Sequence, residues 1–205
     1  MGITVGIIDI GLANVDSVSR AVHYLGFENK RCNSPDDFES VDKLIFPGVG
    51  NFAAATTILK TSQFDAAIKK HCIENKKPIM GICLGMQLLA EYGAEGGGSD
   101  GLGLIKGRVQ LHRGAAKGIT IPHIGWNDVY HQGGVLYQGI ENGACFYFVH
   151  SYELILDCVV SHVAIANHGV DFVASFEYGH LFGVQFHPEK SQMMGLQMLN
   201  NFIEY

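Results

Sequence analysis

A cysteine between two glycines, in Gly81-Ile82-Cys83-Leu84-Gly85, is the strongest chemical signal in the sequence. The buried apolar run Pro78–Ile82 precedes it and a segment with helical spacing follows, so an abrupt strand-to-helix turn is expected. This is the pattern of a nucleophile elbow, with cysteine in place of serine. The start of the helix would favour the thiolate of Cys83. For the pentapeptide alone, a buried structural cysteine is an equally good interpretation.

A second chemical signal is His187-Pro188-Glu189, which directly follows the predicted strand Leu181–Phe186. The carboxyl ends of strands form the rim where α/β sheets place their sites. Glu189 could orient the imidazole of His187 and stabilise its charged form, as in a catalytic triad. A surface turn would also explain the tripeptide. Together with the elbow, however, it predicts a catalytic group of Cys83, His187 and Glu189.

A thiolate that attacks a carbonyl also needs donors for the resulting oxyanion. The backbone amide of Leu84, directly after the nucleophile, is one candidate. The turn Pro47-Gly48-Val49-Gly50 ends a neighbouring predicted strand, Lys43–Phe46, and its two glycines allow the amides of Val49 and Gly50 to turn toward the thiol. A glycine-rich strand-to-helix turn is common, so only its pairing with the elbow favours this role.

Alternating strands and helices must position these residues. The apolar strand Met1–Asp9, a helix that begins at Val15 and ends at Gly26, and helices at Phe52–Lys60 and Leu84–Tyr92 indicate an α/β fold with a doubly wound, mostly parallel sheet and flanking helices. Ser62 and Ser191 are predicted to cap further helices, and Gly93–Gly103 is predicted to be a flexible connector. Short strands in the second half indicate an antiparallel extension. They are expected at Arg108–His112, Ala144–His150, Val159–Ala166, Phe172–Phe176 and Leu181–Phe186. A single domain, 1–205, is expected.

Composition excludes several classes of protein. The 205 residues carry a net charge of −6 with no basic face, so a nucleic-acid partner is not expected. Apolar runs are too short to span a membrane, and no signal peptide is seen. Five cysteines without a Cys-x-x-Cys pair fit a reducing compartment, the cytoplasm. The remaining histidines lack metal-ligand spacing, and neither a metal nor a cofactor is expected.

Three motifs together, Gly-Ile-Cys-Leu-Gly-Met-Gln, Pro-Gly-Val-Gly and Gln-Phe-His-Pro-Glu-Lys-Ser, resemble those of the class I (triad) glutamine amidotransferases. Three further stretches resemble one branch of that family, the glutaminase subunits of imidazole glycerol phosphate synthase. These are Gly101–Ile105, Pro122–Asn127 and Phe146–Tyr152. The resemblance runs from Ile7 to Phe202.

The resemblance implies that the chain hydrolyses glutamine to glutamate and ammonia, with Cys83, His187 and Glu189 as its triad. It implies a heterodimer with a (β/α)₈-barrel cyclase, which would receive the ammonia and form imidazole glycerol phosphate and AICAR in histidine biosynthesis. It further implies that the Gly48–Gly50 strand rearranges to complete the oxyanion hole. Glutamine would be held by Gly50, Gln87, His150, Ser151 and Tyr152, and the partner would be met by Trp126, Asn127, Tyr147 and Lys190.

Three alternatives remain open. The family usually has Gly-x-Gly-Asn where this chain has Gly11-Leu12-Ala13-Asn14. That departure is compatible with a related branch that supplies ammonia for amidating bacterial surface sugars. A plain hydrolase of the same fold, such as a peptidase or γ-glutamyl hydrolase, would share the elbow and the histidine but should lack Gln87 and the His150-Ser151-Tyr152 stretch. A partner-binding protein without activity is disfavoured because the three triad residues are present.

Overall fold

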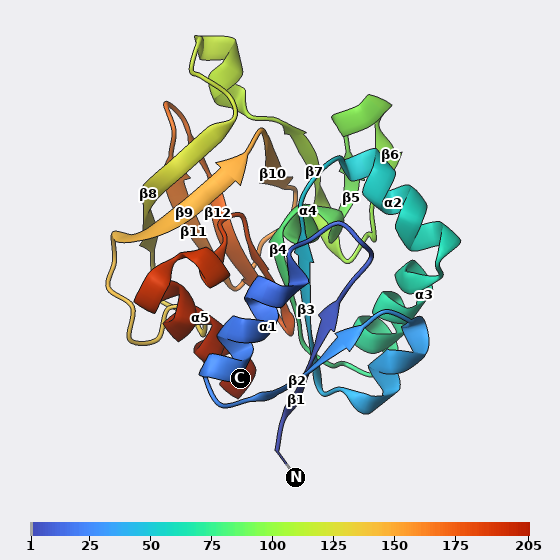
Figure 1. Ribbon diagram of the computed structural model, residues 1–205. Coiled ribbons are helices and arrows are strands. Elements are labelled where there is room, and N and C mark those ends of the chain that lie inside the picture. Colours follow the sequence, from blue (N-terminus) through green and yellow to red (C-terminus); the bar gives the residue numbers. More distant parts are fainter. Residues whose placement is uncertain (1) are drawn as a thin grey trace.

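The computed structural model describes residues 2–205, and a twisted sheet with helices on both faces dominates it (Figure 1). Counted across this nine-stranded sheet from one edge, the first five strands run parallel. The other four extend the sheet with antiparallel neighbours, as expected from the sequence. In spatial order the strands are β2 (Glu28–Cys32), β1 (Thr4–Ile8), β3 (Lys43–Gly48), β4 (Ile79–Cys83), β13 (Leu181–Val184), β12 (Asp171–Tyr178), β11 (His162–Asn167), β8 (His123–His131) and β9 (Ala144–His150).

The central parallel strands are apolar along their length because both of their faces are buried. In β1, Val5 and Ile7 enter the core on one side of the sheet, and Ile8 enters the core on the other side. The predicted strand Met1–Asp9 therefore exists in its central part, while Met1 itself lies outside the described residues.

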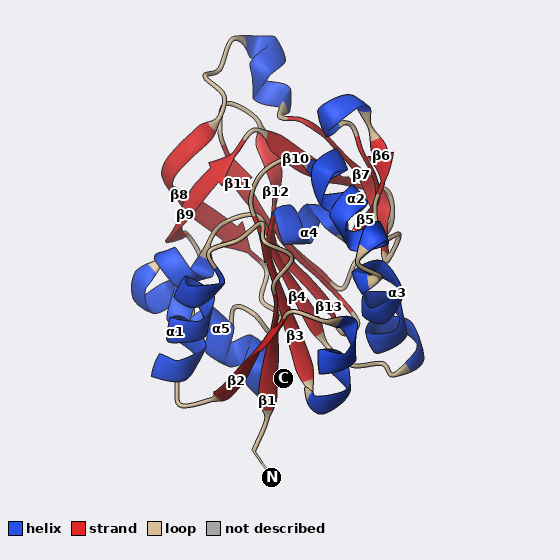
Figure 2. Cartoon of the chain, turned by 45° about the vertical axis from the view of Figure 1, so that its right-hand side comes forward, coloured by secondary structure: helices blue, strands red, loops and turns tan. Residues whose placement is uncertain are grey.

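Five helices cover the two faces of this sheet (Figures 1 and 2). The helices α1 (Val15–Tyr24) and α5 (Gln192–Glu204) pack on the face that carries Val5 and Ile7. The helices α2 (Phe52–Thr61), α3 (Phe64–Lys69) and α4 (Leu84–Leu88) pack on the face that carries Ile8. Asn14 caps α1 by accepting a hydrogen bond from the amide of Ser17 at 3.2 Å. No helix among residues 2–205 is long and apolar enough to cross a membrane.

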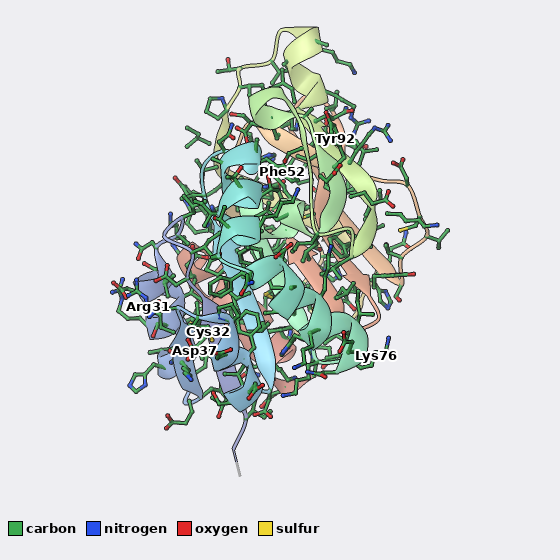
Figure 3. All side chains as sticks on the ribbon, turned by 90° about the vertical axis from the view of Figure 1, so that its right-hand side faces the viewer. Arg31, Cys32, Asp37, Phe52, Lys76 and Tyr92 are labelled. Carbon is green, nitrogen blue, oxygen red and sulfur yellow. The ribbon has the colours of Figure 1, made fainter. Side chains whose placement is uncertain are left out.

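A second, four-stranded sheet packs beside α2. A Cβ atom added to Gly93 would come within 2.5 Å of the ring of Phe52, so the sheet approaches the helix closely only because a glycine is present there. Phe52 and Tyr92 lie toward the same end of the molecule, away from Lys76 (Figure 3). The strands, in order, are β10 (Tyr152–Leu156), β7 (Ile105–Leu111), β5 (Ala90–Gly93) and β6 (Ser99–Asp100).

Two sequence predictions near α4 are wrong. The predicted helix Leu84–Tyr92 ends at Leu88, because backbone amides of Leu102 and Leu104 hydrogen-bond to the carbonyls of Leu88 and Leu89 and draw the chain into the second sheet. The segment Gly93–Gly103 is ordered by a 3₁₀ turn at Glu95–Gly97 and by β6, so it is more than a flexible connector.

The predicted cap at Ser62 is also wrong. Its hydroxyl donates to the carbonyl of Ile58 at 2.6 Å and closes the end of α2, while α3 starts after Gln63 without a side-chain cap. The serine therefore marks the end of one helix where the sequence predicted the start of the next.

Candidate active site

Cys83 lies where β4 turns directly into α4, with φ 54° and ψ −111°. A positive φ is strained for a residue with a side chain and is found at nucleophile elbows. The flanking glycines permit this turn. A Cβ at Gly81 would meet backbone atoms of Met86 at 2.6 Å, and one at Gly85 would overlap the carbonyl oxygen of Phe46 at 1.7 Å. Close packing of α4 against both β4 and β3 therefore accounts for the Gly-x-Cys-x-Gly pattern.

The imidazole of His187 lies between a thiol and a carboxylate. Its Nδ1 is 2.9 Å from Oε1 of Glu189, and both side chains are buried. Burial disfavours the charged imidazole, yet the contacts with Cys83 and Glu189 outweigh this effect and raise the pKa of His187 to about 9. Its Nε2 makes no hydrogen bond within the described residues. The Cys83 thiol instead donates to the carbonyl oxygen of Val149 at 3.7 Å, so the thiol and the imidazole lie near each other without a hydrogen bond between them.

Ser191 fixes the backbone at His187. The sequence predicted that it caps the last helix, but its hydroxyl makes no such bond to α5. It donates to the carbonyl of His187 at 2.6 Å and accepts from the amide of Tyr147 at 3.0 Å. The amide of His187 in turn donates to the carbonyl of Tyr147 at 2.9 Å. The histidine is thereby tied to the edge of β9.

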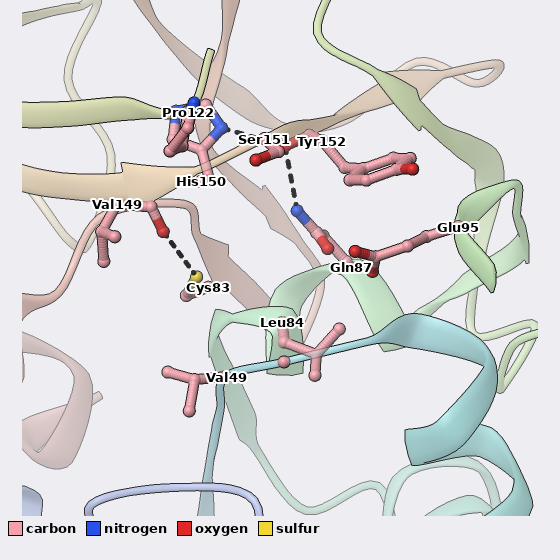
Figure 4. A pocket seen from close by; sticks show the side chains of 11 residues that line it. Val49, Cys83, Leu84, Gln87, Glu95, Pro122, Val149, His150, Ser151 and Tyr152 are labelled. Carbon is pink, nitrogen blue, oxygen red and sulfur yellow. Dashed lines mark hydrogen bonds between the residues drawn. The ribbon is translucent and has the colours of Figure 1, made fainter.

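A pocket of about 290 Å³ opens in front of the Cys83 thiol (Figure 4). It gathers residues from α4, from the Val49-Gly50 turn and from the segment that joins β9 to β10. His187 and Glu189 do not line it. Eight of the residues singled out in the sequence do: Val49, Gly50, Cys83, Leu84, Gln87, His150, Ser151 and Tyr152. Pro122, Val149 and Glu95 complete the lining.

The two candidate oxyanion donors, the amides of Leu84 and Val49, differ in whether they are already hydrogen-bonded within the protein. The amide of Leu84 opens α4, where helical amides have no acceptor within the helix. The amide of Val49 is already engaged, because it donates to the carbonyl of Leu12 at 2.7 Å. Gly50, with φ 106°, supplies a flexible joint beside it. The Val49 peptide must therefore turn before it can serve the pocket.

Comparison with known proteins identifies the family to which the chain belongs. The family model described as "Glutamine amidotransferase class-I" matches residues 6–205. The chain belongs to this family. Curated relatives of this amidotransferase carry the name imidazole glycerol phosphate synthase subunit HisH. The HisH 1 protein of Campylobacter jejuni is 46% identical over 97% of this chain and 98% of its own, and the Escherichia coli HisH protein is 42% identical over 97% of each.

Solved structures show the amidotransferase fold at much lower identity. A putative GMP synthase protein from Thermoplasma acidophilum superposes with a TM-score of 0.77 at 20% identity, covering 100% of this chain and 94% of that one. The PurLQS structure from Thermotoga maritima superposes with a TM-score of 0.76 at 19% identity, covering 100% and 99%. The α/β architecture of this amidotransferase is therefore shared with those structures.

Two residues with polar side chains at the amidotransferase site were missed in the sequence. Glu95 enters the pocket from the glycine-rich segment, held by a hydrogen bond of 2.8 Å from the amide of Phe52 to its Oε2. Gln185, wholly buried, donates to the Cys83 thiol at 3.7 Å. No periodicity marks Glu95. Gln185 is the first residue of the Gln-Phe-His-Pro-Glu-Lys-Ser motif, but no role was predicted for it.

The four residues expected to meet a partner do not share one surface. Trp126 on β8 and Tyr147 on β9 pair edge to face, with ring centroids 5.9 Å apart, and Lys190 Nζ lies 5.9 Å from the Tyr147 ring. These three form an accessible patch on the amidotransferase. Asn127 points to the other face of β8, where its amide donates to the carbonyl of Asn167 at 2.8 Å.

The buried histidines of β8 and β9, His123 and His150, predict a loss of stability in acid. Burial lowers the pKa of His150 to about 3 and of His123 to about 4, from an ordinary value of 6.5. The unfolded chain therefore binds more protons than the native state below about pH 6.5, and stability falls with pH through this window. His187, whose pKa is raised, contributes stability that is lost only as the pH rises toward 9.

We expect the free energy of unfolding in urea to decrease by a few kcal/mol between pH 6.5 and 4. Each proton taken up on unfolding contributes ~1.4 kcal/mol per pH unit. His123→Phe keeps a flat ring but removes one titrating group, so its unfolding should take up about one proton fewer. Urea titrations at four pH values measure both slopes. Equal slopes in the two proteins would contradict the assignment of His123 as a buried neutral imidazole.

Proposed function

We propose that the chain is a single glutaminase domain that hydrolyses L-glutamine through Cys83, His187 and Glu189. The observation that carries this proposal is a strained cysteine at a strand-to-helix turn, open to a pocket and adjacent to a buried imidazole–carboxylate pair. The raised pKa of His187 supports an imidazolium beside Cys83 at neutral pH. Membership of the amidotransferase family supports glutamine as the substrate.

The reaction proceeds in two steps. The Cys83 thiolate adds to the side-chain amide carbon of glutamine, and the C–N bond breaks as His187 gives a proton to the departing nitrogen, releasing ammonia. Water, deprotonated by the now neutral His187, then attacks the thioester. The C–S bond breaks, glutamate leaves and the thiolate–imidazolium pair is restored. Glu189 holds the imidazole in orientation throughout.

The oxyanion of each tetrahedral intermediate needs donors on the pocket side of Cys83. The amide of Leu84 fills one position, and a turned Val49 or Gly50 peptide fills the other. The hydrogen bond from Val49 to Leu12 supports a resting state in which this hole is incomplete. Since one lost oxyanion donor costs about 10²–10³ in rate, the chain alone should be slow.

Glutamine carries an ammonium group, and the pocket offers acceptors for it. The amide nitrogen of Gln87 is held by the carbonyl of Tyr152 at 3.0 Å, which leaves its oxygen for the substrate. The carboxylate of Glu95 lines the same pocket as that amide (Figure 4). We assign Glu95 and Gln87 to the α-ammonium end, with Gly50, His150, Ser151 and Tyr152 around the rest of glutamine.

Replacing Glu95 by glutamine is expected to raise the KM for glutamine about 10- to 100-fold with a smaller change in kcat, because a charge-assisted contact to the bound substrate is lost. The variant keeps an oxygen that can accept the Phe52 amide. Glu91→Gln, on the exposed side of β5, is the matched control. Steady-state glutamate release measures both. An unchanged KM for Glu95→Gln would contradict this placement of the substrate.

The names of the HisH relatives support a synthase partner that would use the ammonia. We propose that the chain forms a cytoplasmic heterodimer with the (β/α)₈-barrel cyclase of imidazole glycerol phosphate synthase, and that the product is imidazole glycerol phosphate with AICAR. The patch of Trp126, Tyr147 and Lys190 would lie at that interface. Asn127 would act from the opposite face of β8.

Glutamate release from glutamine by the purified chain tests the proposal, measured alone and then with the cyclase and its ribonucleotide substrate. We expect a rise of about 10²-fold or more on adding both, as the second oxyanion donor is supplied. Activity that stays absent with both additions would exclude the histidine pathway. Surface-sugar synthases would then be the next partners to test.

A further inference from the structure

The carbonyl oxygen of Tyr152 anchors two side chains in the pocket. It accepts from Nδ1 of His150 at 2.9 Å and from Nε2 of Gln87 at 3.0 Å. A carbonyl oxygen can only accept hydrogen bonds, so the proton of His150 must be on Nδ1. The Nε2 atom of His150 is therefore an acceptor.

That assignment fixes the next imidazole. His123 Nδ1 lies 3.0 Å from Nε2 of His150 and must donate to it, which leaves Nε2 of His123 as an acceptor. Nδ2 of Asn127 lies 3.3 Å from that atom. The amide of Asn127 can be oriented only one way, because Nδ2 also donates to Asn167 and Oδ1 accepts from the amide of Asp128. Donors and acceptors therefore alternate in a determined order.

The series continues from Gln87 to the nucleophile. Nε2 of Gln87 makes a second hydrogen bond, 3.0 Å long, to Oε1 of Gln185. Nε2 of Gln185 then donates to the Cys83 thiol at 3.7 Å. Both N–H groups of Gln87 are used in this way, so its amide plane cannot flip without breaking two bonds.

Burial keeps this series in one protonation state. Burial and the neighbouring imidazoles lower the pKa of His150 to about 3 and of His123 to about 4. A second proton on either ring would place two N–H groups against each other. The ring of His112 packs on His150 and that of His168 on His123, at centroid distances of 5.6 and 4.2 Å, but both lie outside the series.

We propose that His123 and Gln185 are positioning residues of the glutaminase site, acting through one continuous hydrogen-bond series from Asn127 to the Cys83 sulfur. His123 fixes the tautomer of His150 and thereby the Tyr152 carbonyl that holds Gln87. Gln185 accepts a hydrogen bond from the other N–H of Gln87 and donates one from its own amide to the sulfur. The inference rests on the proposed function, since its purpose is to present the oxygen of Gln87 to glutamine and to steady the thiolate.

Four variants test the two roles with the cyclase and its ribonucleotide present. His123→Phe keeps the ring stacking and loses both nitrogens, whereas His123→Asn keeps an amide donor near the position of Nδ1. His112→Phe is the control for packing, because the His112 ring belongs to the same cluster but, among the described residues, makes a single side-chain hydrogen bond, which it accepts from the amide of Gly114. Gln185→Met keeps the length of the side chain without an amide. Circular dichroism establishes that each variant is folded.

We expect His123→Phe to raise the KM for glutamine about 10-fold with kcat within about 3-fold, and His123→Asn to recover most of that loss. His112→Phe should stay within about 3-fold of the wild type in both constants. Gln185→Met should lower kcat about 10-fold and slow the alkylation of Cys83 by iodoacetamide about 10-fold, followed on the Cys83 peptide by mass spectrometry.

The same KM in His123→Phe, His123→Asn and His112→Phe would overturn the role of His123. Alkylation of Cys83 at the wild-type rate in Gln185→Met would overturn that of Gln185. A wild-type chain that releases no glutamate with either the cyclase or a surface-sugar synthase present would instead refute the proposed glutaminase function. The alkylation experiment needs neither partner nor glutamine, so it still decides whether Gln185 acts on the thiol.

Discussion

Replacing Cys83 by alanine is expected to lower glutamine-dependent turnover at least about 10⁴-fold, since removing the nucleophile of a triad leaves only binding and the oxyanion donors. The synthase reaction supplied with free ammonia should be unchanged, because the proposed function places the acceptor chemistry on the partner. The substitution removes no contact that the fold requires. Parallel assays of the complex with glutamine and with an ammonium salt measure the two effects.

The matched control for this substitution is Cys158→Ala. Its thiol is partly exposed and donates to the carbonyl of Lys106, and neither residue lines the pocket. Both rates should stay near those of the wild type. Substantial glutamine hydrolysis by Cys83→Ala would reject the covalent mechanism, and loss of the ammonia reaction would show that Cys83 also affects the acceptor site.

Replacing Gly85 by alanine is expected to destabilise the fold by about 3 kcal/mol or more, at the upper end of what overpacking costs. The added methyl group would lie 1.7 Å from the carbonyl oxygen of Phe46, a backbone atom that cannot rotate away. Helix α4 would have to shift, and with it the Leu84 amide and Gln87. Activity should therefore fall together with stability.

Urea unfolding followed by circular dichroism gives the change in stability. Gly2→Ala is the control, because a Cβ there meets nothing within 4 Å and the residue needs no positive φ. It should alter the free energy of unfolding by less than about 0.5 kcal/mol. A Gly85→Ala protein as stable as the Gly2→Ala protein would mean that β3 and α4 separate more easily than their contact indicates.

Local patterns predicted the elements that carry the chemistry. The apolar run before Cys83 and the strand before His187 are signals from neighbouring residues, and both elements exist close to the predicted bounds. Strand β2, with the sequence Glu-Asn-Lys-Arg-Cys, gives no such signal, because it is an edge strand paired only with β1 and can carry polar residues. Its place depends on pairing with a distant segment.

The rest of the site also depends on contacts between distant residues. Glu95 reaches the pocket because Phe52, 43 residues earlier, holds its carboxylate. The engaged state of the Val49 amide depends on Leu12. Neither contact leaves a pattern in the residues around it, so the pocket wall and the conformation of the Val49-Gly50 turn could be described only from the structure.

The bonds of Ser191 to the edge of β9 also affect solubility. An open edge of a sheet exposes amides and carbonyls that can pair with another copy of the chain. At one edge, β2 carries charged residues that oppose such pairing. At the other, β9 has no acidic or basic residue apart from His150, but the amide and carbonyl of Tyr147 are taken by Ser191 and His187. The contacts that hold the candidate base therefore also protect the unpartnered chain against edge-to-edge aggregation.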